Sequence, residues 1–215
     1  MKALLRKEFT LSFFARPYCF LLLAGLLLIP NYPYLITFFY TTLGIMFLFQ
    51  YNRENRDLDY MMTLPVRKAE MVGARFAQVV VIELLQVLIC IPFMALRSLY
   101  AFLPNQVGLE ASVALLGAGL VLLGLFNLVF LPGYYRNGYS VGIPFLKSCI
   151  VTAVYIVLAE VLLRLVPYFR QYCDSMALSD QLMQLPVLLA GAAIFALLTW
   201  WAWSISVKRF ERIDL

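Results

Sequence analysis

Six long apolar runs dominate this sequence and restrict the chain to folds that a lipid bilayer can solvate. Each is close to the ~20 residues that an α-helix needs to cross roughly 30 Å of hydrocarbon. Because 63% of the residues are apolar and only 13% are charged, too little polar surface is available to cover a water-exposed globule. The sequence therefore predicts an all-α, polytopic membrane protein with six transmembrane helices in a single domain, residues 1–215. The runs span residues 13–29, 34–50, 76–96, 111–131, 148–165 and 185–205.

The first run is the weakest of the six, because Arg16 and Pro17 interrupt its start. Pro30 and Pro33 follow it and cannot continue a helix, so the first two runs are expected to form a tight hairpin.

The lysines and arginines predict the orientation of the chain. If the N-terminus is inside, six spans place 14 of the 17 basic residues on the inner side, and only Arg97, Arg164 and Arg170 outside. This bias is typical of an N-in, C-in membrane protein. The net charge of +5 is thereby explained by topology, and nucleic-acid binding is a poor interpretation of it.

Two segments outside the six runs have an amphipathic character. Residues 1–14 mix charged with large apolar side chains and predict a helix lying in the membrane interface, although they could also be the charged front edge of the first span. Residues 167–184, on the outer side, are rich in aromatics and methionine. They suit either a structure that dips into the interface or an ordinary amphipathic loop.

Several kinds of enzyme are excluded by composition. The chain has no histidine, which removes Ser-His catalysis and the HExxH metalloprotease helix. Its four cysteines form no CxxC pair and are expected to be structural thiols. We expect no catalytic residue, no metal site and no cofactor in this chain.

Two acids interrupt the apolar runs and are candidates for function. Glu83 lies in the third run with Gln86 three residues later, and this pair could line a translocation path. Glu160 lies in the fifth run, where Arg164 could pair with it at i+4. The alternative for both acids is structural, with a protonated or hydrogen-bonded carboxyl group that stabilises helix contacts.

Small residues form stripes that predict close helix packing. One stripe contains Ala114, Gly117, Val121 and Gly124, and another contains Ala192 and Ala196.

The longest inner loop, residues 51–75, carries five basic and four acidic residues. Pro65 suits the first turn of a helix, after which Ala69, Val72 and Phe76 share one face. This pattern predicts a short helix on the inner membrane surface that could slot into a groove of a soluble partner. A solvated loop that obeys only the positive-inside rule is the alternative.

The stretches at residues 49–57, 64–68 and 72–75, together with 1–9 and 131–139, resemble the ABC-2 type permeases of bacterial exporters. Within that family they are most similar to the compact six-span permeases of phenol-soluble-modulin exporters. The resemblance implies a permease dimer in the bacterial cytoplasmic membrane, resting on two ATPase subunits. It also implies that a coupling surface touches the ATPase. On this chain, that surface comprises Glu54, Arg56, Asp57, Leu64, Pro65, Val66, Arg67, Lys68, Tyr135 and Arg136.

The chain contains no GxxxxGK[ST] loop for ATP phosphates, so ATP and Mg²⁺ are expected to bind to a separate ATPase subunit. The apolar composition favours an amphipathic or hydrophobic cargo such as a peptide. Two alternatives are the membrane subunit of an energy-coupling-factor importer and an intramembrane enzyme that processes lipids or peptides. Gly73-Ala74-Arg75 is a poor match to the signature of the importers, and the missing histidine argues against the enzyme.

Overall fold

The computed structural model shows a bundle of long helices. It describes residues 4, 7, 15–63, 65–99, 105, 107–137, 140–165 and 182–212, with the side chains of 15–17, 137, 163 and 164 left aside. No strand occurs in these ranges, so the expected all-α class is confirmed. The helices are α2 (Ala15–Leu21), η1 (Leu22–Leu28), α3 (Leu35–Glu54), α4 (Asp57–Met62), α5 (Lys68–Leu99), α6 (Val113–Asn137), α7 (Gly142–Leu165) and α10 (Leu185–Glu211).

Each of the six apolar runs coincides with helical structure. Four helices, α5, α6, α7 and α10, are long and apolar enough to cross a membrane. The second run forms α3, a 20-residue helix that ends in the polar segment Gln50–Glu54. The first run forms α2 and the 3₁₀ helix η1, with a short apolar stretch over Tyr18–Leu28. That these first two helices also cross remains a prediction.

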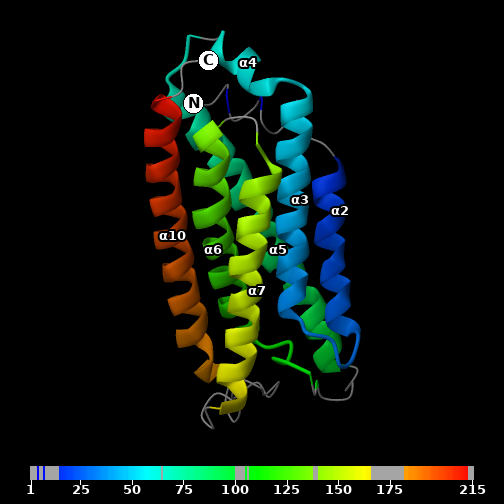
Figure 1. Ribbon diagram of the computed structural model, residues 1–215. Helices are drawn as coiled ribbons and strands as arrows, with labels where there is room; N and C mark the ends of the chain where they lie inside the picture. Colours follow the sequence, from blue (N-terminus) through cyan, green and yellow to red (C-terminus); the bar gives the residue numbers. More distant parts are fainter. Residues whose placement is uncertain are drawn as a thin grey trace.

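The helices alternate in direction, so that α2 begins and α10 ends at the end of the bundle that carries α4 (Figure 1). The turn between η1 and α3 holds Asn31 with a φ of 57°, a conformation that asparagine tolerates. Most described basic residues, among them Arg56, Arg67 and Lys208, belong to the α4 end, whereas Arg97 ends α5 at the other.

The apolar core is centred on α6. Two thirds (67%) of its most apolar stretch is buried, compared with 11% for α7, which lies at the edge of the bundle. One core cluster fills the α4 end, where Phe49 packs edge-on against Phe130 and Tyr134 with ring centroids 5.2 and 4.7 Å apart. A second cluster, which includes Phe38, Leu115 and Phe195, fills the opposite half.

Glycines bring α6 and α10 into close contact. A Cβ atom on Gly191 would clash with the backbone of Gly117, and one on Gly117 would lie 2.7 Å from the carbonyl oxygen of Val187. The expected stripe on α6 therefore does mark close packing at Gly117. On α10 the residue that Gly117 contacts is Gly191. The stripe predicted there, Ala192 and Ala196, did not include this glycine.

The inner loop differs from its predicted form. The helix expected to start at Pro65 and lie along the membrane is wrong, because residues 68–75 form the first turns of α5. A separate short helix, α4, does occur in this loop, but it begins at Asp57. Apolar side chains at 71, 72, 74 and 76 are buried against the bundle, which continues α5 down to Lys68.

The end of α6 also lies beyond its predicted position. Pro132 is within the helix, which continues to Asn137, past the end of the fourth apolar run at residue 131. Tyr134 and Tyr135 are consequently buried in the core. The amphipathic segments 1–14 and 167–184 fall outside the described residues, apart from the helical Leu4 and Lys7 and residues 182–184.

Candidate functional site

The α4 end presents a polar surface, which we call the α4 surface: the exposed side chains of Glu54, Arg56, Asp59, Tyr60, Pro65 and Arg67. It protrudes from the end of the bundle, where α4 runs across the top in Figure 1. Tyr60 is 57% exposed although it is a large aromatic residue. An exposed aromatic ring among charges of both signs is typical of a protein-binding surface.

A left-handed residue and a buried methionine orient α4. Arg56 has a φ of 50°, which turns the chain sharply between α3 and α4. Met61 is then buried in the core cluster while Tyr60 points away from it.

Asp57 anchors the first turn of α4 to the bundle. Its two carboxylate oxygens pair separately with Lys7, near the N-terminus, and with Arg75 on α5. Arg75 is buried and lies with its guanidinium 5.8 Å from the ring centre of Phe49 on α3. One aspartate thus joins α4 to the N-terminal segment and, through Arg75, to α5 and α3.

Arg67 and Lys68 have different environments, although they are adjacent. Arg67 is 84% exposed and donates to Glu70 at 2.7 Å, and this hydrogen bond raises the pKa of Arg67. Lys68 is half-buried, with its Nζ 5.9 Å from the ring centre of Phe210 and 3.5 Å from the carbonyl oxygen of Glu211. Of the two side chains, that of Arg67 is therefore the more accessible to a partner protein.

The structure brings most of the predicted coupling residues together at this end. Tyr135 is buried, with its ring centroid 5.4 Å from that of Phe210 and 6.5 Å from that of Phe76, so it supports the surface from below. Leu64 lies outside the described residues. Of the others, Glu54, Arg56, Pro65, Arg67 and Arg136 are exposed, and Asp57, Val66 and Lys68 are half-buried.

The two predicted path residues, Glu83 and Gln86, are fully buried inside the bundle. Glu83 Oε2 accepts a hydrogen bond from Asn127 Nδ2 on α6 at 2.9 Å, and the same nitrogen lies 3.1 Å from Thr199 Oγ1 on α10. Gln86 donates to the sulfur of Cys90, one turn further along α5, at 3.5 Å.

Glu83, Asn127 and Thr199 form what we call the interior polar cluster, which joins three helices. Sequence reasoning missed Asn127 and Thr199. The available signal was Asn127 itself, an asparagine within the fourth apolar run, since a primary amide in hydrocarbon needs a partner.

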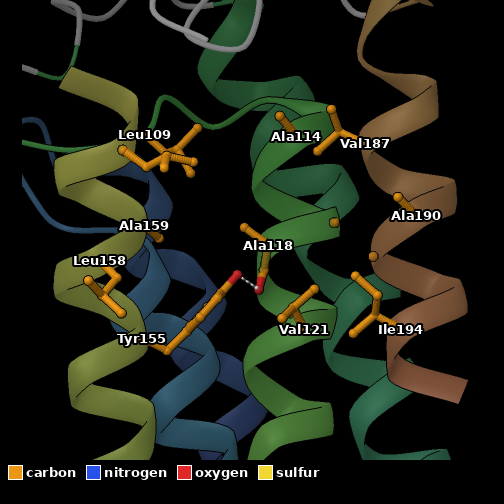
Figure 2. A pocket seen from close by; sticks show the side chains of 13 residues that line it. Leu109, Ala114, Ala118, Val121, Tyr155, Leu158, Ala159, Val187, Ala190 and Ile194 are labelled. Atoms are coloured by element: carbon orange, nitrogen blue, oxygen red, sulfur yellow. Dashed lines mark hydrogen bonds between the residues drawn. The ribbon is translucent and has the colours of Figure 1, made fainter. Parts of the chain in front are cut away.

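An apolar groove of about 340 Å³ lies between α7 and α10, with α6 as its floor (Figure 2). Its one described hydroxyl, that of Tyr155, donates to the carbonyl oxygen of Ala118 at 3.0 Å, and this bond leaves the lining apolar. Leu158 and Leu162 on its rim are more than half exposed, so the groove opens sideways to the bundle surface. The lining comprises Leu109, Ala114, Gly117, Ala118, Val121, Tyr155, Leu158, Ala159, Leu162, Val187, Ala190, Gly191 and Ile194.

The end of the bundle opposite α4 is fastened by a buried ion pair. Arg97, at the end of α5, lies 2.6 Å from Glu110 and 5.1 Å from the ring centre of Tyr34. Glu110 also accepts from the backbone N–H of Asn105 at 2.5 Å, while the side-chain amide of Asn105 donates to the carbonyl oxygen of Tyr32. The pKa of Tyr32 is raised to about 12, mainly because the hydroxyl is buried and to a smaller extent because of its hydrogen bond with Tyr40.

Two features are thus suited to function: an exposed α4 surface tied to α5, and an apolar groove open towards the surroundings of the bundle. Comparison with protein families matches residues 3–211 to the family described as ABC-2 family transporter protein. The match covers nearly the whole chain. No curated protein and no solved structure matches it.

Proposed function

This chain belongs to the ABC-2 family of transporter proteins and is a membrane permease subunit of an ABC transporter; from that premise we propose that it exports an amphipathic or hydrophobic cargo. A separate ATPase subunit hydrolyses ATP and drives the transport. The permease works as a dimer of two permease chains in a bacterial cytoplasmic membrane, with both termini inside. The outward direction is proposed from the resemblance of residues 1–9 and 49–57 to exporter permeases.

The α4 surface is the observation that carries the proposed contact with the ATPase. The helix α4 is short and lies between the two long helices α3 and α5. The exposed Tyr60 and the charged side chains of the α4 surface suit a groove on a soluble partner. Asp57 and Arg75 tie α4 to α5, so a displacement of α4 would pull on a long helix of the bundle.

The groove supports a hydrophobic cargo. Its walls expose aliphatic side chains and its floor is made of small residues, so a hydrocarbon chain or an apolar peptide face could lie against α6. Because it opens sideways, cargo dissolved in the bilayer could enter it without crossing water.

The test is reversal of charge at the two basic residues before α5, Arg67→Glu with Lys68→Glu. We expect the purified variant to remain folded, because Arg67 is exposed and the half-buried Lys68 lies at the very start of α5, and to lose most of the stimulation of its ATPase. The matched control is Lys147→Glu with Lys208→Glu, which removes two exposed basic residues of the same end away from α4. Full ATPase stimulation and transport by the Arg67/Lys68 variant would exclude this surface as the coupling contact.

The existence of the partner is tested separately. The tagged permease, purified in mild detergent from its native host, is expected to bring down a P-loop ATPase in stoichiometric amount. A pure permease without any ATPase would contradict the proposed transporter.

A further inference from the structure

The interior polar cluster contains two oxygen atoms whose hydrogen bonding is incomplete. Glu83 Oε1 and Asn127 Oδ1 have no hydrogen-bond donor among the described residues, and both are shielded from solvent. They belong to the same two side-chain groups that are already joined, since Asn127 Nδ2 donates to Glu83 Oε2 at 2.9 Å. A buried polar atom without a partner is costly, so two of them in one contact require an explanation.

The chemistry of the two groups supplies that explanation. An ionised carboxylate and an amide oxygen are both acceptors, so they cannot satisfy each other. A protonated carboxyl group has one O–H donor. A proton on Oε1 would therefore let Glu83 donate to Asn127 Oδ1 while Oε2 keeps accepting from Nδ2, which joins acid and amide by two hydrogen bonds.

We propose that Glu83 and Asn127 form a proton-binding site in the middle of the bundle, in which one proton, held on Glu83 Oε1 and shared with Asn127 Oδ1, completes the link between α5 and α6. Thr199 on α10 positions Asn127 by accepting from its amide nitrogen. This site takes a proton from water and forms one O–H bond, without any other reactant. The site lies within the bundle and involves neither the cargo nor the ATPase.

No described charged group is close enough along these helices to neutralise an ionised Glu83. On α5 the nearest is Arg75, eight residues or roughly 12 Å away along the helix, and its partner is Asp57. The nearest on α6 and α10 are Arg136 and Lys208, each nine residues from its cluster member.

The elements packed against these helices add no nearby counter-ion. The titratable side chains of the surrounding helices α2, α3 and α7, as far as they are described, are Tyr18 and Cys19 on α2, Tyr40, Tyr51, Arg53 and Glu54 on α3, and Lys147, Cys149, Tyr155 and Glu160 on α7. Cys90 and Arg97 follow Glu83 on α5 itself. None of them is paired with Glu83 in the structure. A proton is therefore the simplest way to neutralise this carboxyl group.

Infrared spectroscopy of the purified permease in lipid nanodiscs tests the proposal directly. Wild-type protein at neutral pH should show the carbonyl stretch of a neutral carboxylic acid. That band should disappear in Glu83→Gln and persist in Glu160→Gln, the same change at the other acid within an apolar run. A wild-type spectrum without the band, or a band that survives in Glu83→Gln, would overturn the proposal.

A second measurement uses the fact that glutamine imitates the protonated acid. Its amide can both donate to Oδ1 and accept from Nδ2, so Glu83→Gln should fold with a thermal midpoint within a few degrees of wild type. Alkaline pH removes the proton from wild type only. Wild type should therefore lose more thermal stability than Glu83→Gln as the pH rises. Parallel loss in both proteins, or failure of Glu83→Gln to fold while Glu160→Gln folds, would count against a shared proton.

Discussion

Removing the charge of Glu110 should destabilise the protein strongly, because it leaves a buried cation behind. Arg97 has no solvent exposure, and Glu110 is its carboxylate partner at 2.6 Å. In Glu110→Gln the guanidinium keeps its carbonyl contact with Leu27 at 3.4 Å and the face of Tyr34, but it loses the carboxylate that lies 2.6 Å from it. Neither contact replaces an ion pair.

The size of the effect follows from this geometry. Breaking a buried ion pair at one partner costs about 3–5 kcal/mol. For a chain of about 200 residues, each kcal/mol lowers the thermal midpoint by about 2–4 °C, so the expected decrease is roughly 6–20 °C. The double variant Arg97→Met/Glu110→Gln removes the cation too and keeps an acceptor for the Asn105 N–H. It should recover more than half of the loss.

Thermal unfolding in one detergent, followed by tryptophan fluorescence, measures these differences. The control is Glu54→Gln, the same change at an exposed acid of the opposite end, which should change the unfolding free energy by no more than about 0.5 kcal/mol. A Glu110→Gln variant that melts within the range of Glu54→Gln would contradict a stabilising role of the ion pair. A double variant less stable than Glu110→Gln would show that the loss does not come from a buried cation without its counter-ion.

Two further substitutions probe other contacts. Gly191→Ala puts a Cβ into the backbone of Gly117 and should cost about 1–3 kcal/mol, whereas Gly142→Ala, which meets no atom within 4 Å, should be neutral in the same melting assay. Asp57→Asn removes the carboxylate that pairs with two cations, so it should lower the free energy of unfolding by about 1–3 kcal/mol and reduce ATPase stimulation. The control Asp59→Asn, at an exposed residue of the same helix, should leave stability unchanged. Equal effects of the two aspartate changes would contradict the anchoring role of Asp57.

The helices were predictable because an apolar run of about 20 residues can cross a bilayer only if its backbone hydrogen bonds are made within the run, as in a helix. All six runs are helical, and the boundaries at Leu185 and near Leu165 lie close to their predicted places. The start of α5 and the end of α6 were not predicted correctly from the sequence. Pro65 looks like the start of a separate helix and Pro132 like the end of one, but where a helix begins or ends depends on what its terminal turns pack against. Residues 71–76 and Tyr134 are buried by the bundle, and this burial extends both helices.

The candidate site was predictable in its position and not in its pairings. Charge and family resemblance placed coupling residues between α3 and α5, where the structure has the α4 surface. The links from Asp57 to Lys7 and from Glu83 to Asn127 join residues 50 and 44 positions apart. Helical periodicity assigns a residue to a face of its own helix, whereas the identity of the neighbouring helix is a property of tertiary packing.

These pairings have α5 in common. Arg75 binds α4 through Asp57, Glu83 binds α6 through Asn127, and Arg97 binds Glu110 in the segment before α6. The helix has 32 residues, or roughly 48 Å of length, and therefore reaches from the α4 surface to the opposite end of the bundle. Pro92 lies between the second and third anchors and removes one backbone hydrogen bond from the helix there. A displacement of α4 would thus act on a helix that is anchored at three positions along its length. Because a backbone hydrogen bond is missing at Pro92, bending this helix costs least free energy there.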